Sequence, residues 1–460
     1  MVFSSLLFLF RFLPVSFIAY YAAPKRLKNL VLFLSSLFFY SWGEVRYFPI
    51  MLSIILVNYF AGLAIEKYRE NIPLRRSVLT ISIIFSVGFL AVFKYADFVI
   101  SNINAWFKTG IPNLSLTLPL GISFYTFQIM TYTIDVYLQK AKAERNFIDF
   151  GTFVVLFPQL IAGPIVKFVD IHKELKSREI TLDMVQQGIE TFILGLGSKV
   201  LLANSIGSLW TELENIGFAS VSTPLAWLGI IAYTLQIYFD FSGYSLMAIG
   251  LGKMLGFTFP QNFNYPYISR SIKEFWRRWH MTLSGWFREY LYFPLGGSRV
   301  GKGRAFFNLF VVWFCTGLWH GANWNFIFWG LYYFLFISLE RLWLHSFLDK
   351  HKILSHIYAL FVIVLGWGLF AITDLGQLGI FFSRLFSFTG GDDWMFYLRD
   401  YAEIFIFGIL FSMPILNKIR DALPQKASMP VRIVFSGVVL LLSVAYLVDS
   451  SYNPFLYFRF

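Results

Sequence analysis

His320 is the residue in this sequence that is best placed for proton-transfer chemistry. It lies within residues 310–330, a stretch without a charged residue that is long enough to lie in a bilayer. Keeping an ionisable side chain there is costly, so its presence indicates a functional site. A histidine also takes up and returns protons near neutral pH. Gly317 and Gly321 leave room beside it for a ligand or for another backbone. The alternative is a packed histidine bonded to a neighbouring helix.

A second candidate, His280, lies in the aromatic and basic segment 274–297. Helical spacing over this segment places Trp276 and His280 on one face of a predicted helix. Glu274 and Arg278 are four residues apart, so they are predicted to form an ion pair on another face.

Two interpretations of this predicted helix remain open. In the first, it is a cytoplasmic amphipathic helix whose basic face lies on anionic membrane lipid. In the second, it carries His280 into a site while Arg277, Arg278 and Arg288 meet an anionic ligand, because guanidinium groups recognise phosphates. Coenzyme A or an acidic carrier protein would fit the second interpretation.

Asp240 is a third candidate, flanked by Tyr238, Ser242 and Tyr244 near the end of a predicted span. A carboxylate at this position can orient a histidine or bind substrate, or it can cap a helix at the membrane interface. The pattern alone leaves these alternatives open.

The sequence offers no motif for a metal or a tightly bound cofactor. Cys315 is the single cysteine, which excludes an internal disulfide and a multi-cysteine metal site. A paired-histidine motif, a nucleotide-binding loop and a serine nucleophile elbow are missing as well. We therefore expect no bound cofactor and no metal.

Composition indicates that these residues are carried by membrane helices. Of the 460 residues, 57% are hydrophobic and 14% are charged, whereas about a quarter are charged in a typical soluble protein. The net charge of +12 does not indicate nucleic-acid binding, because Lys and Arg lie in short loops between apolar runs, as membrane topology requires.

The apolar runs predict an all-α polytopic membrane protein with about twelve spans. With the basic clusters on the cytoplasmic side, both termini lie outside. The predicted spans are 4–23, 29–43, 46–65, 77–93, 118–138, 186–206, 224–243, 305–321, 324–344, 353–373, 400–417 and 432–449.

Two regions, 147–184 and 244–300, are too polar to span the membrane and too apolar to be free loops. Irregular backbone at membrane depth is tolerated only against protein or a water-filled cavity. We therefore expect re-entrant or interfacial elements that line a site. The chain shows no internal repeat, so residues 1–460 are predicted to form one integral membrane domain.

Five long motifs stand out along the chain: Pro119–Phe127, Phe157–Pro164, Tyr238–Tyr244, Phe275–Gly297 and Leu318–Ala322. Together they resemble the membrane-bound O-acyltransferase family, and the similarity is greatest to the bacterial branch that O-acetylates alginate. This resemblance implies a ring of tilted helices around a central tunnel. The invariant histidine of the family corresponds to His320, and a second, less strictly kept histidine corresponds to His280.

Acyl transfer from a thioester to a hydroxyl needs a base and a site that stabilises the oxyanion. His320 is the candidate base, with Trp319, Asn323 and Trp324 as donors that are nearby in sequence. Trp276, Arg277 and Arg278 are expected to contact the donor, which is acetyl-CoA or a phosphopantetheine-linked acyl group arriving from the cytoplasm.

The segment 431–460 adds a last span that ends in Phe455–Phe460. This ending resembles the C-terminal motif of a one-span partner in teichoic acid D-alanylation, which implies that Tyr457 carries the acyl group outside the membrane. The alternative is an aromatic belt with a snorkelling arginine.

Together these features predict an acyltransferase of the bacterial cytoplasmic (inner) membrane that serves O-acetylation of an envelope or exported polysaccharide. A separate extracytoplasmic O-acetyltransferase is the expected partner, and nucleic acid is not. One alternative is D-alanyl transfer from a carrier protein. The other is a transporter that moves an acyl donor without bond chemistry.

Overall fold

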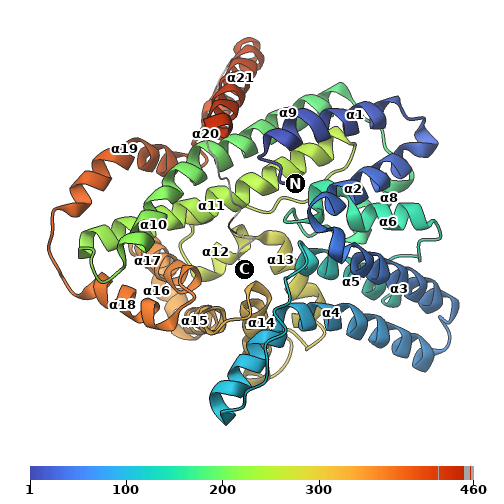
Figure 1. The fold of residues 1–460 in the computed structure, drawn as a ribbon, viewed down its shortest axis with the longest axis horizontal. Helices are drawn as coiled ribbons and strands as arrows, with labels where there is room; N and C mark the ends of the chain where they lie inside the picture. Colours follow the sequence, from blue (N-terminus) through green and yellow to red (C-terminus); the bar gives the residue numbers. More distant parts are fainter. Residues whose placement is uncertain (423, 450–455, 457–460) are drawn as a thin grey trace. The chain divides into compact units, whose positions relative to one another are not determined.

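The computed structural model describes residues 1–422, 424–449 and 456, and every regular element in that part of the chain is helical (Figure 1). Residue contacts divide the chain into two compact units. Unit 1 comprises Met1–Phe192 and Ser245–Pro260, and unit 2 comprises Ile193–Tyr244 and Gln261–Phe460. The predicted all-α class is confirmed for the described residues.

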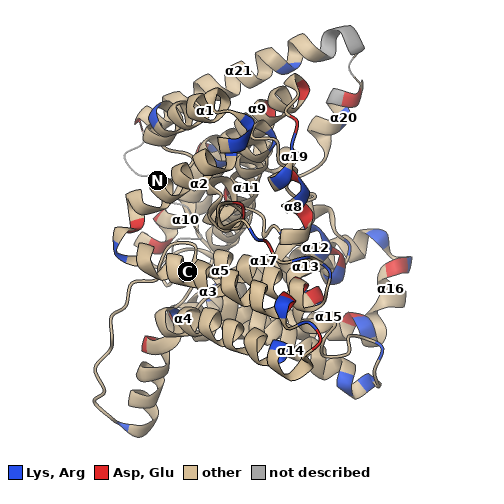
Figure 2. Ribbon diagram, turned by 90° about the vertical axis from the view of Figure 1, so that its right-hand side faces the viewer, with Lys and Arg blue, Asp and Glu red and all other residues tan. Residues whose placement is uncertain are grey.

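Seven helical runs among the described residues are long and apolar enough to cross a membrane, which confirms a multi-pass protein. Two shorter apolar helices, Phe8–Ala22 and Leu375–Phe386, add to them. Figure 2 shows that these helices are largely without charged residues. The seven runs are Lys25–Lys67, Ile72–Phe107, Leu182–Ile216, Thr223–Met254, Trp324–Lys350, Lys352–Ala371 and Met429–Asp449.

Unit 1 contains the first eight α-helices and the start of α9. The predicted spans 29–43 and 46–65 correspond to α2 and α3, which a short 3₁₀ turn separates inside one apolar run. The helices are α1 (Leu13–Ala22), α2 (Lys28–Glu44), α3 (Phe48–Lys67), α4 (Ile72–Phe107), α5 (Ile122–Tyr137), α6 (Phe147–Val155), α7 (Phe157–Leu160), α8 (Phe168–Lys176) and α9 (Leu182–Gly197).

Unit 2 contains the candidate histidines. It includes the π-helices η4 (Ser198–Ala203), η6 (Arg288–Tyr292) and η7 (Glu340–Leu344) and the 3₁₀ helix η5 (Pro266–Ile268). Its α-helices are α10 (Asn204–Ile216), α11 (Thr223–Met254, whose last turns belong to unit 1), α12 (Ile272–Arg278), α13 (Met281–Phe287), α14 (Lys302–His320), α15 (Trp324–Leu339), α16 (His345–Lys350), α17 (Lys352–Ala371), α18 (Leu375–Phe386), α19 (Asp393–Phe411), α20 (Ile415–Ala422) and α21 (Gln425–Asp449).

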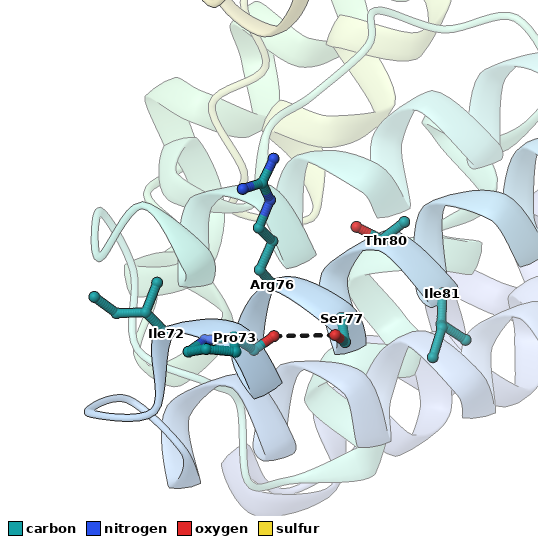
Figure 3. A pocket seen from close by; sticks show the side chains of 6 residues that line it. All are labelled: Ile72, Pro73, Arg76, Ser77, Thr80 and Ile81. Atoms are coloured by element: carbon teal, nitrogen blue, oxygen red, sulfur yellow. Dashed lines mark hydrogen bonds between the residues drawn. The ribbon is translucent and has the colours of Figure 1, made fainter.

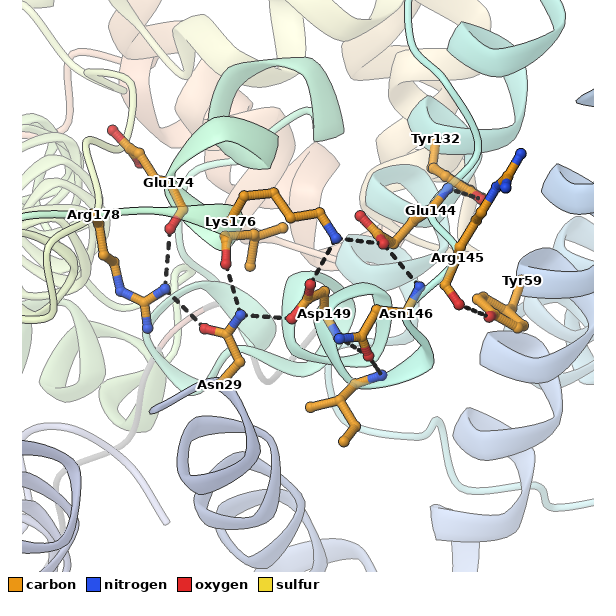
Figure 4. Close-up of polar contacts among 12 residues, drawn as sticks. Asn29, Tyr59, Tyr132, Glu144, Arg145, Asn146, Asp149, Glu174, Lys176 and Arg178 are labelled. Atoms are coloured by element: carbon orange, nitrogen blue, oxygen red, sulfur yellow. Dashed lines mark hydrogen bonds and ion pairs between the residues drawn. The ribbon is translucent and has the colours of Figure 1, made fainter. Parts of the chain in front are cut away.

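The region 147–184 forms the short helices α6, α7 and α8 and the beginning of α9, and most of α6 and α7 is buried. A polar network holds α8 to α2 and α6 (Figure 4). The Lys176 ammonium bonds to Glu144 at 2.6 Å and to Asp149 at 2.8 Å, and Asn29 bonds to Asp149 at 2.6 Å. Arg178 donates to the Asn29 side chain at 2.8 Å. The basic end of this region is therefore structural.

α14 and α15 form a hairpin in which glycines bring the two backbones together. A Cβ atom added to Gly317 would lie far inside van der Waals contact with the carbonyl oxygen of Phe326. A Cβ atom on Gly330 would meet the Trp313 carbonyl oxygen in the same way. The space beside Gly317 is thus filled by the α15 backbone, which is one of the two predicted uses, whereas the space beside Gly321 is filled by the Phe326 ring.

The substitution Gly317→Ala should therefore destabilise the protein by about 1–3 kcal/mol, the usual cost of overpacking. Gly303→Ala is the matched control, because it lies in the same helix with nothing within 4 Å of its added Cβ. Thermal unfolding of the detergent-solubilised protein measures both. Equal melting temperatures for the two variants would contradict the close helix contact.

Candidate active site

His320 is the last residue of α14 and is 4% exposed. The helix ends there because Gly321 is extended, and α15 begins after Asn323 caps it by accepting the Trp324 N–H at 2.7 Å. The Asn323 side-chain oxygen is thus occupied by the helix cap. The hairpin turn therefore fixes His320 at the end of α14, close to the start of α15.

The His320 imidazole lies among aromatic rings. The ring centroids of Trp319, Trp329 and Phe370 lie 4.9, 4.8 and 5.2 Å from it, all edge to face. Trp276 packs against Trp329 at 5.5 Å, which links the segment Phe275–His280 to His320. A histidine in such apolar surroundings is shielded from bulk water, and its electrostatic interactions are correspondingly strong.

Two indole N–H groups in this cluster are buried without a hydrogen-bond partner in the described part of the structure: Nε1 of Trp276 and Nε1 of Trp329. A buried donor left unsatisfied costs about 1–3 kcal/mol. Such groups require an explanation, and an acceptor on a bound substrate provides one. Sequence analysis identified Trp276 but missed Trp329, whose apolar neighbours gave no signal.

His280 lies at a break between α12 and α13, so the continuous helix predicted within the segment 274–297 is wrong. α12 ends at Arg278, and His280 adopts a left-handed conformation with φ 41° and ψ 55°. Trp276 and His280 therefore do not share a face of one helix. A left-handed residue that is not glycine is uncommon and costs about 1–3 kcal/mol, so surrounding contacts must hold it.

Asn262 provides those contacts. Its side-chain oxygen accepts hydrogen bonds from Thr282 N at 3.3 Å and Thr282 Oγ1 at 2.9 Å, and it lies 3.0 Å from His280 Nδ1. Its carbonyl oxygen accepts from Met281 N at 2.9 Å. Asn262 thereby satisfies the first N–H groups of α13, which a helix start leaves without partners. Sequence analysis missed Asn262 because it precedes α13 by many residues.

These contacts determine the tautomer of His280. A main-chain N–H can only donate, so the atom of Asn262 that receives it must be the oxygen. That oxygen in turn requires His280 Nδ1 to be the protonated nitrogen, which makes Nε2 the basic one. Burial lowers the pKa of the His280 imidazole to about 3, and this histidine is therefore neutral near pH 7.

Trp319 contacts both histidines, at 5.9 Å from the His280 ring and 4.9 Å from the His320 ring. The structure therefore brings His280, His320, Trp319 and Trp276 into one aromatic cluster in unit 2. Phe241 also packs on His280, at 4.7 Å.

The predicted arginines differ in their surroundings. Arg278 makes the predicted i,i+4 ion pair with Glu274 at 3.0 Å, and it also donates to the Asn264 carbonyl oxygen at 3.2 Å. Arg277 and Arg288 are exposed. Arg278 thus has a structural role at the end of α12, whereas Arg277 is accessible to a ligand.

Two side chains accept hydrogen bonds from the first main-chain N–H groups of α12. Ser271 Oγ accepts the Glu274 N–H at 3.0 Å. The buried Glu340 carboxylate accepts the N–H groups of Ile272 at 2.5 Å and Lys273 at 3.0 Å. A carboxylate also interacts favourably with the positive end of the helix.

Asp240 lies inside α11, which continues to Met254, so the interpretation of Asp240 as a helix cap at a span end is wrong. Its side chain forms a buried ion pair with Lys199 at 2.5 Å. Its other oxygen accepts the main-chain N–H of Leu456 at 2.8 Å. Lys199, which sequence analysis missed, lies in η4. Tyr457 lies outside the described residues.

Two surface hollows lie in unit 1, and neither contains a predicted site residue. One, of about 620 Å³, is lined by Ile72–Ile81 of α4 and includes Arg76 (Figure 3). The other, of about 510 Å³, lies between Phe8–Ala22 and α2 and includes Arg11. Among the described residues, no group of three or more His, Cys, Asp or Glu side chains is arranged to hold a metal ion.

The sequence of residues 16–351 matches the family model of the membrane-bound O-acyltransferases. This chain belongs to the membrane-bound O-acyltransferase family. It is 37% identical to a probable alginate O-acetylase of Azotobacter vinelandii over the whole of both chains. It is also 37% identical to a peptidoglycan O-acetyltransferase of Helicobacter pylori, with 82% of this chain and 78% of the relative aligned.

A more distant relative is a teichoic acid D-alanyltransferase of Streptococcus thermophilus, which is 31% identical with 49% of this chain and 58% of the relative aligned. The predicted family and the predicted enzyme class, a membrane-bound O-acyltransferase, are confirmed.

The low pKa of His280 predicts a pH dependence of stability. The unfolded chain binds a proton at this residue below about pH 6.5, whereas the folded protein does not until about pH 3. Stability from neutral His280 is therefore lost as the pH falls below about 6.5. Between pH 7.5 and pH 5, the wild type should lose about 2 kcal/mol that a His280→Gln variant does not lose.

Thermal unfolding of both proteins at the two pH values measures this difference. An equal loss of melting temperature in the wild type and in His280→Gln would show that His280 titrates normally.

Proposed function

We propose that this membrane-bound O-acyltransferase moves an acetyl group from a cytoplasmic thioester, acetyl-CoA or a phosphopantetheine-linked donor, for O-acetylation of a cell-envelope or exported polysaccharide. The observation that carries the proposal is the contact of Trp319 with both buried histidines. The relatives named as alginate O-acetylase and peptidoglycan O-acetyltransferase support a polysaccharide as the final acceptor.

In the proposed reaction, a hydroxyl oxygen attacks the thioester carbonyl carbon while His320 takes the hydroxyl proton. The tetrahedral oxyanion collapses, the carbon–sulfur bond breaks, and the leaving thiolate receives the proton from the His320 imidazolium. The buried indole N–H groups of Trp276 and Trp329 are suitable donors to the oxyanion. The aromatic surroundings exclude water, which limits hydrolysis of the thioester.

His280 is proposed to act beside His320 through its basic Nε2, because Asn262 holds its Nδ1. A neutral imidazole in this position accepts a hydrogen bond from the donor or the attacking hydroxyl. Asn323 fixes the turn after His320. Asp240 is proposed to act indirectly, because its ion pair with Lys199 lies next to Phe241, which packs on His280.

The arrangement in the membrane completes the proposal. About twelve spans would surround a central tunnel in a bacterial cytoplasmic membrane, with both termini outside. Tyr457 would accept the acyl group at the outer end, and a separate extracytoplasmic O-acetyltransferase would pass it to the polymer. The teichoic acid relative favours a D-alanyl carrier as the second candidate donor.

His320→Ala should reduce acyl transfer about 10²–10⁴-fold, the usual cost of removing a general base. Free thiol released from acetyl-CoA by the purified protein measures the reaction, and a D-alanyl carrier protein supplied instead distinguishes the two donors. The melting temperature checks that the variant is folded. Near-wild-type turnover by folded His320→Ala would end its role as the base.

Arg277→Glu should raise the KM for the donor more at low salt than at high salt, because exposed charges are screened over about 8–10 Å at physiological ionic strength. Arg278→Glu is the matched comparison, since it breaks the ion pair with Glu274 and should lower stability at all salt concentrations. Steady-state kinetics and thermal unfolding at two salt concentrations separate the effects. A salt-independent KM in Arg277→Glu would remove it from the donor site.

A further inference from the structure

Unit 2 contains a buried ion pair that lies beside the candidate active site without joining it. Lys199 Nζ and Asp240 Oδ1 are 2.5 Å apart, and the two residues are 3% and 1% exposed. Taking two charges out of water is expensive, and a buried pair often adds little net stability compared with apolar residues of similar volume. The energetic cost of burying these two charges indicates that the ion pair has a role beyond packing.

The pair lies where helices approach unusually closely. A Cβ atom on Gly243 would be 2.7 Å from the Gly195 carbonyl oxygen and 3.0 Å from the Lys199 amide nitrogen, so α11 and the end of α9 are in backbone contact. Lys199 itself lies in the π-helix η4, an irregularity often found at functional sites.

Helix α21 also packs close to Lys199. A Cβ atom on Gly197, two residues before Lys199, would be 2.5 Å from Val439 of α21. Ser443 lies 3.9 Å from the same position. α21 therefore packs against the start of η4.

The second oxygen of Asp240 holds a peptide group from the C-terminus. Oδ2 accepts the main-chain N–H of Leu456 at 2.8 Å, and the Leu456 side chain is only 7% exposed. The next residue of α11, Phe241, packs on His280 at 4.7 Å. Leu456 is thus bound to Asp240, whose neighbour in α11, Phe241, contacts His280 of the candidate active site.

We propose that the Asp240–Lys199 pair is a binding site for a peptide main chain, and that its occupant is the C-terminal segment of this same chain. The Lys199 ammonium pairs with one oxygen of the Asp240 carboxylate, and the other oxygen accepts the Leu456 N–H in a charge-assisted hydrogen bond. This part of the proposal rests on geometry alone. Its consequence, that the site sets Tyr457 in place for acyl delivery, rests on the proposed function.

Two double variants test the site without leaving one buried charge unpaired: Lys199→Met with Asp240→Asn, and Lys199→Met with Asp240→Leu. Both remove the two charges, which preserves folding far better than removing one. The asparagine keeps an acceptor for the Leu456 N–H, and the leucine does not. Their difference therefore isolates the proposed hydrogen bond.

The readout is maleimide labelling of a Leu456→Cys substitution in the full-length, detergent-solubilised protein, with Cys315→Ser to remove the native thiol. Val448→Cys on α21, 68% exposed, reports full accessibility. Glu340→Gln is the matched control, because Glu340 is another buried carboxylate that accepts main-chain N–H groups and serves α12 instead.

Labelling of the thiol introduced by Leu456→Cys should be slow with the native pair and with Glu340→Gln. Labelling should be roughly ten- to a hundredfold faster in the double variant that contains Asp240→Leu, as expected for losing a hydrogen bond to a charged group. The Asp240→Asn double variant should label at an intermediate rate. Equal labelling in the native, asparagine and leucine backgrounds would overturn the proposed site. With the native pair, labelling of Leu456→Cys as fast as that of Val448→Cys would also overturn it.

Hydrogen exchange of the C-terminal peptide in the chain that retains Leu456 controls for the cysteine substitution. Slow exchange with the native pair and fast exchange with Asp240→Leu supports the site, and fast exchange in both overturns it. Delivery of acetyl groups to polymer separates the two proposals. If the double variant with Asp240→Leu labels faster but still delivers acetyl groups to the polymer at the native rate, the peptide-binding site stands. The role of Tyr457 in the proposed function is then excluded.

Discussion

The geometry of the candidate active site depends on the side-chain oxygen of Asn262. It receives the Thr282 N–H, the Thr282 hydroxyl and His280 Nδ1. By doing so it stabilises a left-handed residue at the break between α12 and α13. The same oxygen determines which nitrogen of His280 is basic. One amide therefore sets the position, the orientation and the tautomer of this histidine.

The other histidine is placed by packing. The hairpin of α14 and α15 requires Gly317 and Gly330, whose backbones touch the opposite helix. This close approach puts His320 at the end of α14 against Trp329, and Trp319 contacts both histidines. The aromatic rings surround the two imidazoles with a medium of low dielectric. Their electrostatic interactions and hydrogen bonds are therefore stronger there than in water. The chemistry of the family is consistent with such a medium.

Structural features that depend on the membrane environment, or on residues close together in the sequence, could be predicted from the sequence. A bilayer accepts only long apolar helices, so hydropathy was sufficient for the all-α class. The cost of an ionisable group in an apolar run was sufficient to single out His320. The Glu274–Arg278 pair followed from helical spacing.

Features set by distant residues could not be predicted. Helical periodicity continued through His280, and only Asn262, far upstream, explains why the helix breaks there. Asp240 looked like the end of a span because its partners, Lys199 and Leu456, lie far away in sequence. Trp329 lies in an aromatic run of α15, and the sequence did not mark its N–H group as buried without a partner. Each of these needs tertiary contacts that a single sequence does not display.

The central claim is that His280 and His320 act as one centre joined by Trp319. A double-mutant cycle on acyl transfer, with His280→Ala, His320→Ala and the double variant, tests it most directly. Residues that act as a unit are strongly non-additive, so the double variant should be about as slow as His320→Ala alone. Losses that simply multiply would show that the two histidines act independently and would contradict the account.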